Sequence, residues 1–354
     1  MRWLCLAALL ASGCGVAVSR ASALPACGGP VSPDQLGAIH FLSDRVGVGL
    51  TVLPRRCGAM LAVSRDGGRH WRTEGTALAI DGPVEQMVAT SPRDAWAAVE
   101  GGRLMSTTDG GATWTTESPR GSVLALAVSG RTVWMLGCLG APDYDCAAVL
   151  LRKTLPDGVW TIASPKLTPN PPPDLVVARG RALISETRSL VTVTDRGRRF
   201  TTRPNPTWMG RPCFPAGLAA AGRNSWLLCL GGAAAGSSAK ALLHTTDGGR
   251  TWTIASQVTS LTAPPQPGAI TREEPDALVA ASATRLWLAA LNNLFVSSDG
   301  GARWSLVRGP NPQGDPTSFD VLSPTHAWLL AGGQGLWRTT DGRHWAALAR
   351  PIQP

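Results

Sequence analysis

The chain has 354 residues and a formal net charge of +9, although charged residues make up only 16 % of it. Its 40 glycines and 28 prolines favour many short strands and turns and argue against long surface helices. A chain of this length can fold as two average domains or as one closed all-β ring.

The N-terminus holds the only long apolar run, which is typical of an export signal. Arg2 is its charged end, residues 3–18 are apolar, and Ala21-Ser22-Ala23 matches an A-x-A cleavage site. We expect residues 1–23 to be a signal peptide and the protein to be secreted or held in the cell envelope. Cys14 also resembles a lipobox cysteine, so a lipid anchor is the alternative to full release. The run is short for a membrane span of about 20 residues.

Six cysteines remain after this segment, and an even number in an exported chain predicts disulfides. Several connectivities are open, and the simplest one joins neighbours in order. The expected pairs are Cys27–Cys57, Cys138–Cys146 and Cys213–Cys229. A metal site is a poor rival, because no CxxC pair occurs and the histidines are scattered. We expect neither a metal nor a cofactor.

One short pattern recurs through the rest of the chain, most clearly in residues 245–252, Thr-Thr-Asp-Gly-Gly-Arg-Thr-Trp. The Asp can accept hydrogen bonds from backbone amides, the glycines allow positive φ, and the Trp can bury a large ring as the next strand begins. Each copy therefore predicts a tight turn between two strands. The aspartates are Asp66, Asp109, Asp157, Asp195, Asp247, Asp299 and Asp341, of which Asp157 and Asp195 belong to worn copies; the tryptophans of the other five are Trp71, Trp114, Trp252, Trp304 and Trp345.

A second signal accompanies the turns. A short apolar strand, often with a Trp, precedes each of them, as in residues 95–97, 226–228 and 328–330. Another apolar stretch precedes that strand, so each unit reads as four short strands. Seven such units at a period of about 40–50 residues predict an all-β fold, a seven-bladed β-propeller over residues 36–354. Residues 24–35 form an N-terminal segment that could help to close the ring.

The repeated turn resembles the Asp-box (BNR) repeat family, and the likeness covers nearly all of the mature chain. The group of photosystem II assembly/stability factors is most similar, because it also pairs a Trp strand with each turn and has seven blades. The resemblance implies the propeller fold and says little about function, since in the family these turns lie at the periphery, away from active sites. It gives the turn residues a structural role.

The two faces of such a propeller should differ. The short turns share one face and carry many arginines, which predicts a basic surface. This surface is either a docking site for an acidic partner or a set of turns whose arginines only keep them solvated. The other face holds the long, proline-rich loops, where binding usually resides. The binding candidates are Arg55, Arg56, Tyr144, Trp208, Arg211, Glu273 and Glu274.

Enzymatic alternatives find less support. A sialidase needs a Tyr nucleophile, and the only Tyr is Tyr144, with no sialidase-type Arg-Ile-Pro motif in the chain. Another glycosidase needs two carboxylates facing one cleft, and adjacent acids such as Glu273 and Glu274 are more often a solvated bend. Basic and aromatic residues are not interleaved as nucleic-acid binding would require. The sequence thus favours a monomeric, non-catalytic scaffold that binds a protein or an anionic envelope polymer, with contact to the membrane only through the lipid anchor; a glycoside hydrolase is the alternative.

Overall fold

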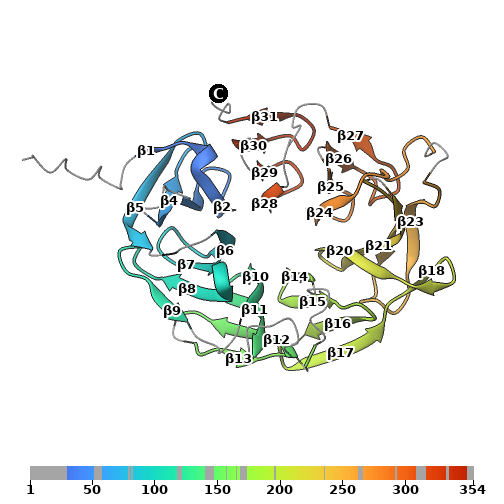
Figure 1. The fold of residues 1–354 in the computed structure, drawn as a ribbon, viewed down its shortest axis with the longest axis horizontal. Coiled ribbons are helices and arrows are strands. Elements are labelled where there is room, and N and C mark those ends of the chain that lie inside the picture. The colour runs from blue at the N-terminus through green and yellow to red at the C-terminus, as the bar shows by residue number, and fades with distance from the viewer. Residues whose placement is uncertain are drawn as a thin grey trace, which may run out of the picture.

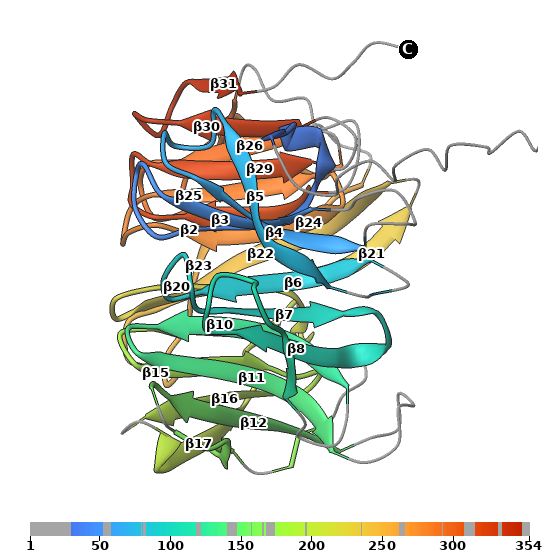
Figure 2. The same ribbon diagram turned by 90° about the vertical axis from the view of Figure 1, so that its left-hand side faces the viewer.

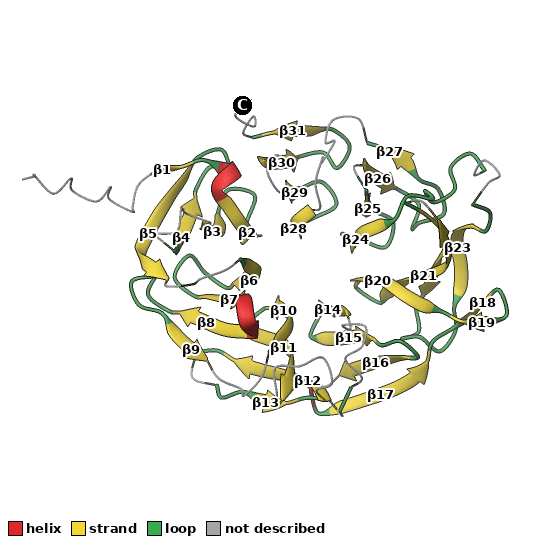
Figure 3. Ribbon diagram, in the orientation of Figure 1, coloured by secondary structure: helices red, strands yellow, loops and turns green. Residues whose placement is uncertain are grey.

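The computed structural model describes residues 30–51, 58–78, 80, 83–117, 122–139, 147–156, 158–164, 166–167, 174–194, 197–234, 236–261, 266–291, 293–307, 316–331 and 335–348. They form seven antiparallel sheets of at least four strands around a central axis (Figure 1). The predicted all-β, seven-bladed propeller is confirmed. Two 3-10 turns are described in full, η1 (Pro33–Gln35) and η2 (Glu100–Gly102) (Figure 3). No helix in the described part of the chain is long and apolar enough to cross a membrane.

Each blade uses four consecutive strands, the innermost first. Blades 1 and 2 contain β2 (Leu36–Phe41), β3 (Gly47–Thr51), β4 (Ala59–Ser64) and β5 (Trp71–Leu78), then β6 (Val84–Ala89), β7 (Ala95–Val99), β8 (Arg103–Thr107) and β9 (Thr115–Glu117). Blades 3 and 4 contain β10 (Val123–Ser129), β11 (Thr132–Leu139), β12 (Ala147–Thr154) and β13 (Thr161–Ile162), then β14 (Asp174–Ala178), β15 (Arg181–Ser185), β16 (Ser189–Thr194) and β17 (Arg199–Pro204).

The remaining blades follow the same order. Blade 5 contains β20 (Phe214–Ala221), β21 (Asn224–Ala234), β22 (Ser237–Thr245) and β23 (Thr253–Val258), and a separate hairpin, β18 (Thr207–Trp208) and β19 (Arg211–Pro212), precedes it. Blades 6 and 7 contain β24 (Pro275–Ala280), β25 (Leu286–Ala290), β26 (Asn293–Ser297) and β27 (Ser305–Leu306), then β28 (Pro316–Val321), β29 (Ala327–Ala331), β30 (Gly335–Thr339) and β31 (Trp345–Ala347).

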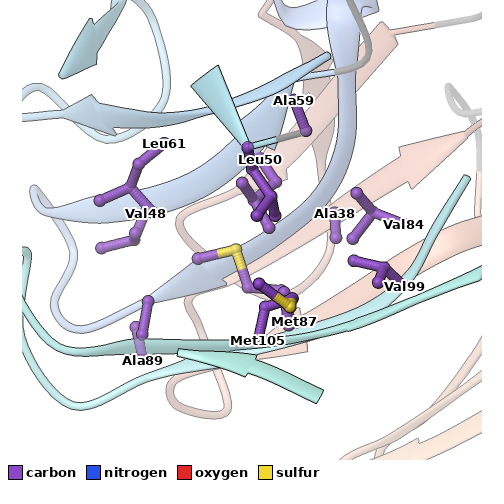
Figure 4. Packing of buried hydrophobic residues seen from close by; sticks show 13 residues of the cluster. Ala38, Val48, Leu50, Ala59, Leu61, Val84, Met87, Ala89, Val99 and Met105 are labelled. Atoms are coloured by element: carbon purple, nitrogen blue, oxygen red, sulfur yellow. The ribbon is translucent and has the colours of Figure 1, made fainter. Parts of the chain in front are cut away.

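The hydrophobic core is divided into seven wedges, one at each interface between neighbouring blades. The wedge between blades 1 and 2 is representative: Val48, Leu50 and Leu61 of blade 1 meet Met87 and Met105 of blade 2 (Figure 4). Second strands are buried on both faces, which is why they read in the sequence as unbroken apolar runs. Burial of these apolar surfaces is the main force that holds the blades together.

The repeated turn, called here the Asp turn, has the geometry that its residues suggest. In blade 5, Asp247 Oδ1 accepts hydrogen bonds from the backbone N–H groups of Arg250 (2.8 Å) and Thr251 (3.0 Å). The Thr245 hydroxyl donates to the same carboxylate oxygen at 2.8 Å and accepts from Gly249 N–H at 3.1 Å. The turns at Asp66, Asp109, Asp299 and Asp341 use the same kind of bonds, so the Asp substitutes for missing ladder partners.

The Asp turn also joins its blade to the preceding one. Trp226 of blade 5 donates its indole N–H to the carbonyl of Gly300 in the turn of blade 6 at 2.9 Å, and Trp328 of blade 7 donates to Gly67 of blade 1 at 3.0 Å. A Cβ atom on Gly301 would lie 2.4 Å from Leu242 of blade 5, so this position needs glycine for space as well as for its φ of +94°.

The ring closes between blades 7 and 1 without a shared blade. The N-terminal strand β1 (Pro30–Val31) pairs with the outer strand β5 and widens blade 1 outwards. Closure relies on side chains: Ser318 donates to Ile39 O at 3.2 Å, Asp320 accepts from Phe41 N–H, and Phe41 stacks on Trp328 with ring centroids 3.7 Å apart.

We predict that the indole bond at this seam contributes measurably to stability. Trp328→Phe should lower the free energy of unfolding by about 1–2 kcal/mol more than Trp287→Phe, because it leaves the buried Gly67 carbonyl without its donor. Trp287 is the matched control, since its buried indole nitrogen has no hydrogen-bond partner among the described residues. Denaturant unfolding measures both; equal losses would show that only ring volume matters.

The Asp turns also predict acid sensitivity. Hydrogen bonds from the side chain and backbone of Thr113 lower the pKa of Asp109 to about 2. A folded-state pKa below the unfolded value near 3.8 gives stability that is present above about pH 4 and is lost as the pH falls towards 2. Asp109→Asn should reduce this loss in a pH series of thermal unfolding.

Candidate functional site

Two faces of the disc can be assigned from hydrogen bonds. In blades 1 and 2, the backbone N–H groups of Gly67 and Gly110 in the Asp turns donate to the carbonyls of Arg45 (2.8 Å) and Arg93 (3.0 Å) between the first and second strands. These two kinds of turn therefore lie together on what we call the turn face. The connections between second and third strands lie on the opposite side, the loop face; Figure 2 shows the disc edge-on, with strands running between the two faces.

The turn face exposes a ring of arginines. Those on its turns whose side chains are exposed are Arg45, Arg65, Arg69, Arg93, Arg131, Arg179, Arg198, Arg199, Arg223, Arg250, Arg303 and Arg343. Among the described residues only one of them, Arg65, has a carboxylate partner, Glu74 at 3.1 Å. The turn aspartates are occupied by backbone N–H groups, so most of this positive charge is not neutralised locally.

The loop face departs from seven-fold regularity at the hairpin β18–β19, which lies at the rim beside blade 5 (Figure 1). Residues 209 and 210 link its two strands, and both have positive φ, +51° for Met209 and +74° for Gly210. That backbone suits a two-residue hairpin turn. It is a less common conformation for Met, and the Met209 side chain is 62 % exposed.

Three contacts fix this hairpin to the propeller. The Asn205 side-chain amide is buried and donates to the carbonyls of Glu186 (2.8 Å), Thr187 (3.1 Å) and Cys213 (3.2 Å). Trp208 donates its indole N–H to Gln257 Oε1 at 3.0 Å. The predicted disulfide Cys213–Cys229 is confirmed and joins the residue after the hairpin to β21. The hairpin is therefore held rigidly.

A groove of about 530 Å³ lies beside the hairpin. It is called the loop-face groove, and its lining residues are Trp208, Met209, Arg211, Pro212, Phe214, Leu230, Gly231 and Gly232. Phe214 is 47 % exposed, which is unusual for a large apolar side chain, and Arg211 is the only charged residue among the described residues of the lining. Its volume lies in the range of about 300–1,000 Å³ that is common for ligand sites.

A smaller cavity of about 210 Å³ shares Phe214 and Leu230 with the groove. Two carboxylates, Asp174 and Glu186, line it. Glu186 is 8 % exposed and accepts a hydrogen bond from the Ser189 hydroxyl. The acid pair is of the type that glycosidases use, but the cavity is smaller than common ligand sites.

The structure brings some of the candidate residues together. Trp208 and Arg211 lie in the same groove, although Trp208 is only 6 % exposed and packs mainly into the core between blades 4 and 5. Arg55, Arg56, Tyr144 and Asp195 lie outside the described residues, as do Cys14, Cys27, Cys57 and Cys146. Cys138 is disulfide-bonded. The pairings Cys27–Cys57 and Cys138–Cys146 stay predictions.

Glu273 and Glu274 do not line the loop-face groove; they lie beside the connection between β21 and β22, where Glu273 forms a β-bridge with Ser237. Both carboxylate oxygens of Glu273 accept from Asn293 Nδ2 at 2.9 Å, and the Glu273 carbonyl accepts from Lys240 Nζ. The backbone N–H of Glu274 donates to Gly236 O at 3.1 Å. The two acids are thus part of the support of an extended hairpin rather than an open pair of carboxylates.

Lys240 is a fully buried charge that the repeat pattern does not reveal. Burial lowers its pKa to about 8, against the opposing effect of the nearby acids Glu274, Glu273 and Asp276. The only sequence signal is a lone Lys within the otherwise uncharged strand at residues 237–245. Because its buried side chain leaves no space for a ligand, we assign it a structural role.

A third cavity, of about 460 Å³, occupies the central axis, and innermost strands such as β2, β6, β10, β24 and β28 line it. Its titratable lining groups are His40, Glu85 and Asp320. Burial raises the pKa of Asp320, whose carboxylate lies 3.8 Å from His40 Nδ1 and accepts from the Phe41 backbone. This acid belongs to the ring closure.

Comparison with solved structures agrees with the fold. The structure of "YCF48 bound to D1 peptide" superposes with a TM-score of 0.59 at 16 % identity, over 90 % of this chain and 95 % of that one. YCF48 from Cyanidioschyzon merolae gives 0.55 at 15 % identity, over 90 % and 97 %. The GH74 xyloglucanase from Xanthomonas campestris gives 0.56 at 16 % identity, over 92 % of this chain and 56 % of that one.

These likenesses show a shared propeller fold at low identity. The chain spans about half the length of the xyloglucanase. No protein-family model matches the chain, and no curated protein sequence matches it. The Asp-box resemblance therefore stays a prediction from the sequence.

We predict an unusual rise of stability in the alkaline range. The folded-state pKa of Lys240, about 8, lies below its ordinary value of 10.5, so the unfolded chain binds more protons between these values and stability increases as the pH rises through them. The chain has only three lysines, Lys153, Lys166 and Lys240, which keeps other alkaline titrations few. Denaturant unfolding at pH values from about 7.5 to 10.5 spans the two pKa values of Lys240. The free energy of unfolding should rise over this range in the wild type and not in Lys240→Met.

Proposed function

We propose that this protein is a non-catalytic β-propeller that works outside the cytoplasm as a protein-binding or assembly scaffold. The observation that carries the proposal is the loop-face groove. A rigid hairpin held by the Cys213–Cys229 disulfide has no counterpart among the described residues of the other blades, and Met209 of this hairpin and Phe214 of β20 are exposed next to Arg211. An apolar segment with a nearby carboxylate is the kind of protein ligand that this chemistry suits.

Two further observations support a binding role. In one of the similar structures YCF48 is bound to a D1 peptide, so a propeller of this shape can present a peptide-binding surface. The N-terminal pattern supports export, either by cleavage after residue 23 or by an anchor at Cys14. Arginines on the turn face support an acidic protein or an anionic envelope polymer as a second partner class.

The proposal predicts that binding depends on the groove. Met209→Asn together with Phe214→Thr removes the two exposed apolar side chains, and Asn tolerates the positive φ at position 209. Affinity for a partner captured from envelope extracts should fall at least about tenfold, as expected for central apolar contacts. Leu322→Thr is the control, because it removes an exposed apolar side chain (42 %) from the opposite face.

A glycoside hydrolase is the alternative, favoured by the acid pair in the small cavity. A panel of glycosides tests it directly. Turnover by the wild-type chain that disappears in Glu186→Gln or Asp174→Asn would contradict the non-catalytic proposal. Unchanged partner binding in the Met209→Asn, Phe214→Thr variant would contradict the assignment of the groove.

A further inference from the structure

Exposed apolar side chains fall into two groups in the described residues. Three of the nine large ones, Met209, Phe214 and Leu291, lie around the loop-face groove and the neighbouring β25–β26 turn. The others lie at the turns of the turn face or on outer strands, and they are Val159, Ile162, Phe200, Ile254, Leu306 and Leu322. The second group is unevenly distributed, because five of its six members belong to blades 3–6.

The outer strands show this asymmetry at one repeated position. The second residue after the turn Trp is Ile162 in blade 3, Ile254 in blade 5 and Leu306 in blade 6, with exposures of 60 %, 51 % and 56 %. In blade 4, Phe200 takes the place of the turn Trp and is 53 % exposed. Blades 1 and 2 have Thr73 and Thr116 at the same position, opposite the third strand, and of these two Thr116 is exposed while Thr73 is buried.

Charge follows the same division. The turns of blades 3–6 expose Arg131, Arg179, Arg198, Arg199, Arg223, Arg250 and Arg303. Within the described turn-face and outer-strand residues of these blades, the only acids are Asp247 and Asp299, and backbone N–H groups occupy both carboxylates. The turns of blades 3 and 4 also contain Asp157 and Asp195, which lie outside the described residues. Blades 1 and 2 instead carry Asp44, Asp94, Glu74 and Glu117 in the corresponding places.

We propose that the turn-face side of blades 3–6, called the basic–apolar sector, docks on a membrane surface that contains anionic phospholipids. The strands β13, β17, β23 and β27 outline this sector over about half of the rim (Figure 1). Arginines near an anionic bilayer are attracted by its negative surface potential, and aliphatic or aromatic side chains beside them can enter the headgroup region. This inference uses a different surface from the loop-face groove and does not depend on the proposed function.

A lipid surface fits the arrangement better than an acidic protein does. The four apolar side chains stand on four separate outer strands, and none of the three cavities described above includes them. A protein partner needs a contiguous complementary patch, of about 800 Å² on each side. Separate apolar side chains, each near arginines, can enter a fluid interface independently. Docking by the turn face would leave the loop-face groove directed away from the membrane.

Sedimentation of the whole chain with lipid vesicles tests this inference. The wild type should bind phosphatidylcholine vesicles that contain phosphatidylglycerol, bind pure phosphatidylcholine vesicles weakly, and lose binding as salt screens the charges. All variants share the same N-terminal segment, so its contribution is equal among them and is measured by the pure phosphatidylcholine vesicles.

Two pairs of matched variants locate the surface. Arg223→Gln, Arg250→Gln and Arg303→Gln together should weaken binding at least about tenfold, while the same number of charges removed at Arg45, Arg93 and Arg343 should change it less than about twofold. Ile162→Thr, Ile254→Thr and Leu306→Thr together should weaken binding at least about fivefold, whereas Leu322→Thr, which removes an exposed apolar side chain from the turn face of blade 7, should change it less than about twofold. Thr is the native residue at this position in blades 1 and 2, so the sector variant should fold, which thermal unfolding checks.

Three results would overturn the inference. The wild type could fail to bind phosphatidylglycerol vesicles. The two arginine triples could weaken binding equally, which would indicate a net-charge effect without a sector. Soluble polyglutamate could bind the chain while vesicles do not, which would assign the sector to an acidic protein.

Discussion

The regularity of the ring depends on the contact between the Asp turn of one blade and the blade before it, which recurs at four interfaces through the second glycine of the turn. The first glycine of the turn offers its carbonyl to the preceding blade, as Gly300 does to Trp226. The second glycine lies against a leucine of that same blade, as Gly301 does against Leu242. One eight-residue pattern thus closes its own hairpin and sets the distance to its neighbour. A side chain at the second glycine would push two blades apart.

Where the Asp turn has lost part of its pattern, the second-strand Trp of the preceding blade has a different hydrogen-bond partner or none among the described residues. Blade 3 has a degraded turn, and Trp96 of blade 2 donates to the carboxylate of Glu117 at 3.2 Å instead of to a turn carbonyl. Trp160 and Lys153 of blade 3 donate to the same carboxylate. Burial alone would raise the pKa of Glu117, but hydrogen bonds from Lys153, Ser106 and Trp160, together with the charge of Lys153, outweigh burial and lower it. Trp134 and Trp287, which lie in the cores between blades 3 and 4 and between blades 6 and 7, have buried indole nitrogens without partners in the described residues.

The fold was predictable because its determinants are local and repeated. Asp, Gly and Trp recur with fixed spacing, and each residue has a physical role within its own turn. Contacts between blades were less accessible, since the sequence does not show that Gly67 lies beside Trp328, 261 residues away. Only part of the lining of the loop-face groove could be predicted from the sequence. Trp208 and Arg211 stood out as an aromatic and a charge in a proline-rich stretch, but Phe214 and Leu230 looked like ordinary strand residues, and only the disulfide-bonded hairpin gives them a shared cavity.

Deviation from the repeat, rather than the repeat itself, distinguishes one part of this disc from another. Seven equal blades would present the same surface in every direction, and a partner could not select one orientation. The hairpin before blade 5 breaks that equivalence on the loop face, because Asn205 and the Cys213–Cys229 bond attach an element with no counterpart in the described part of the other blades. The exchange of Thr for Ile or Leu at one rim position breaks it on the turn face. The exchange at the rim affects side chains that the wedge cores do not need, so a scaffold held together by its Asp turns can vary there at little cost in stability. The hairpin, by contrast, adds Trp208 and Cys213 to the core between blades 4 and 5.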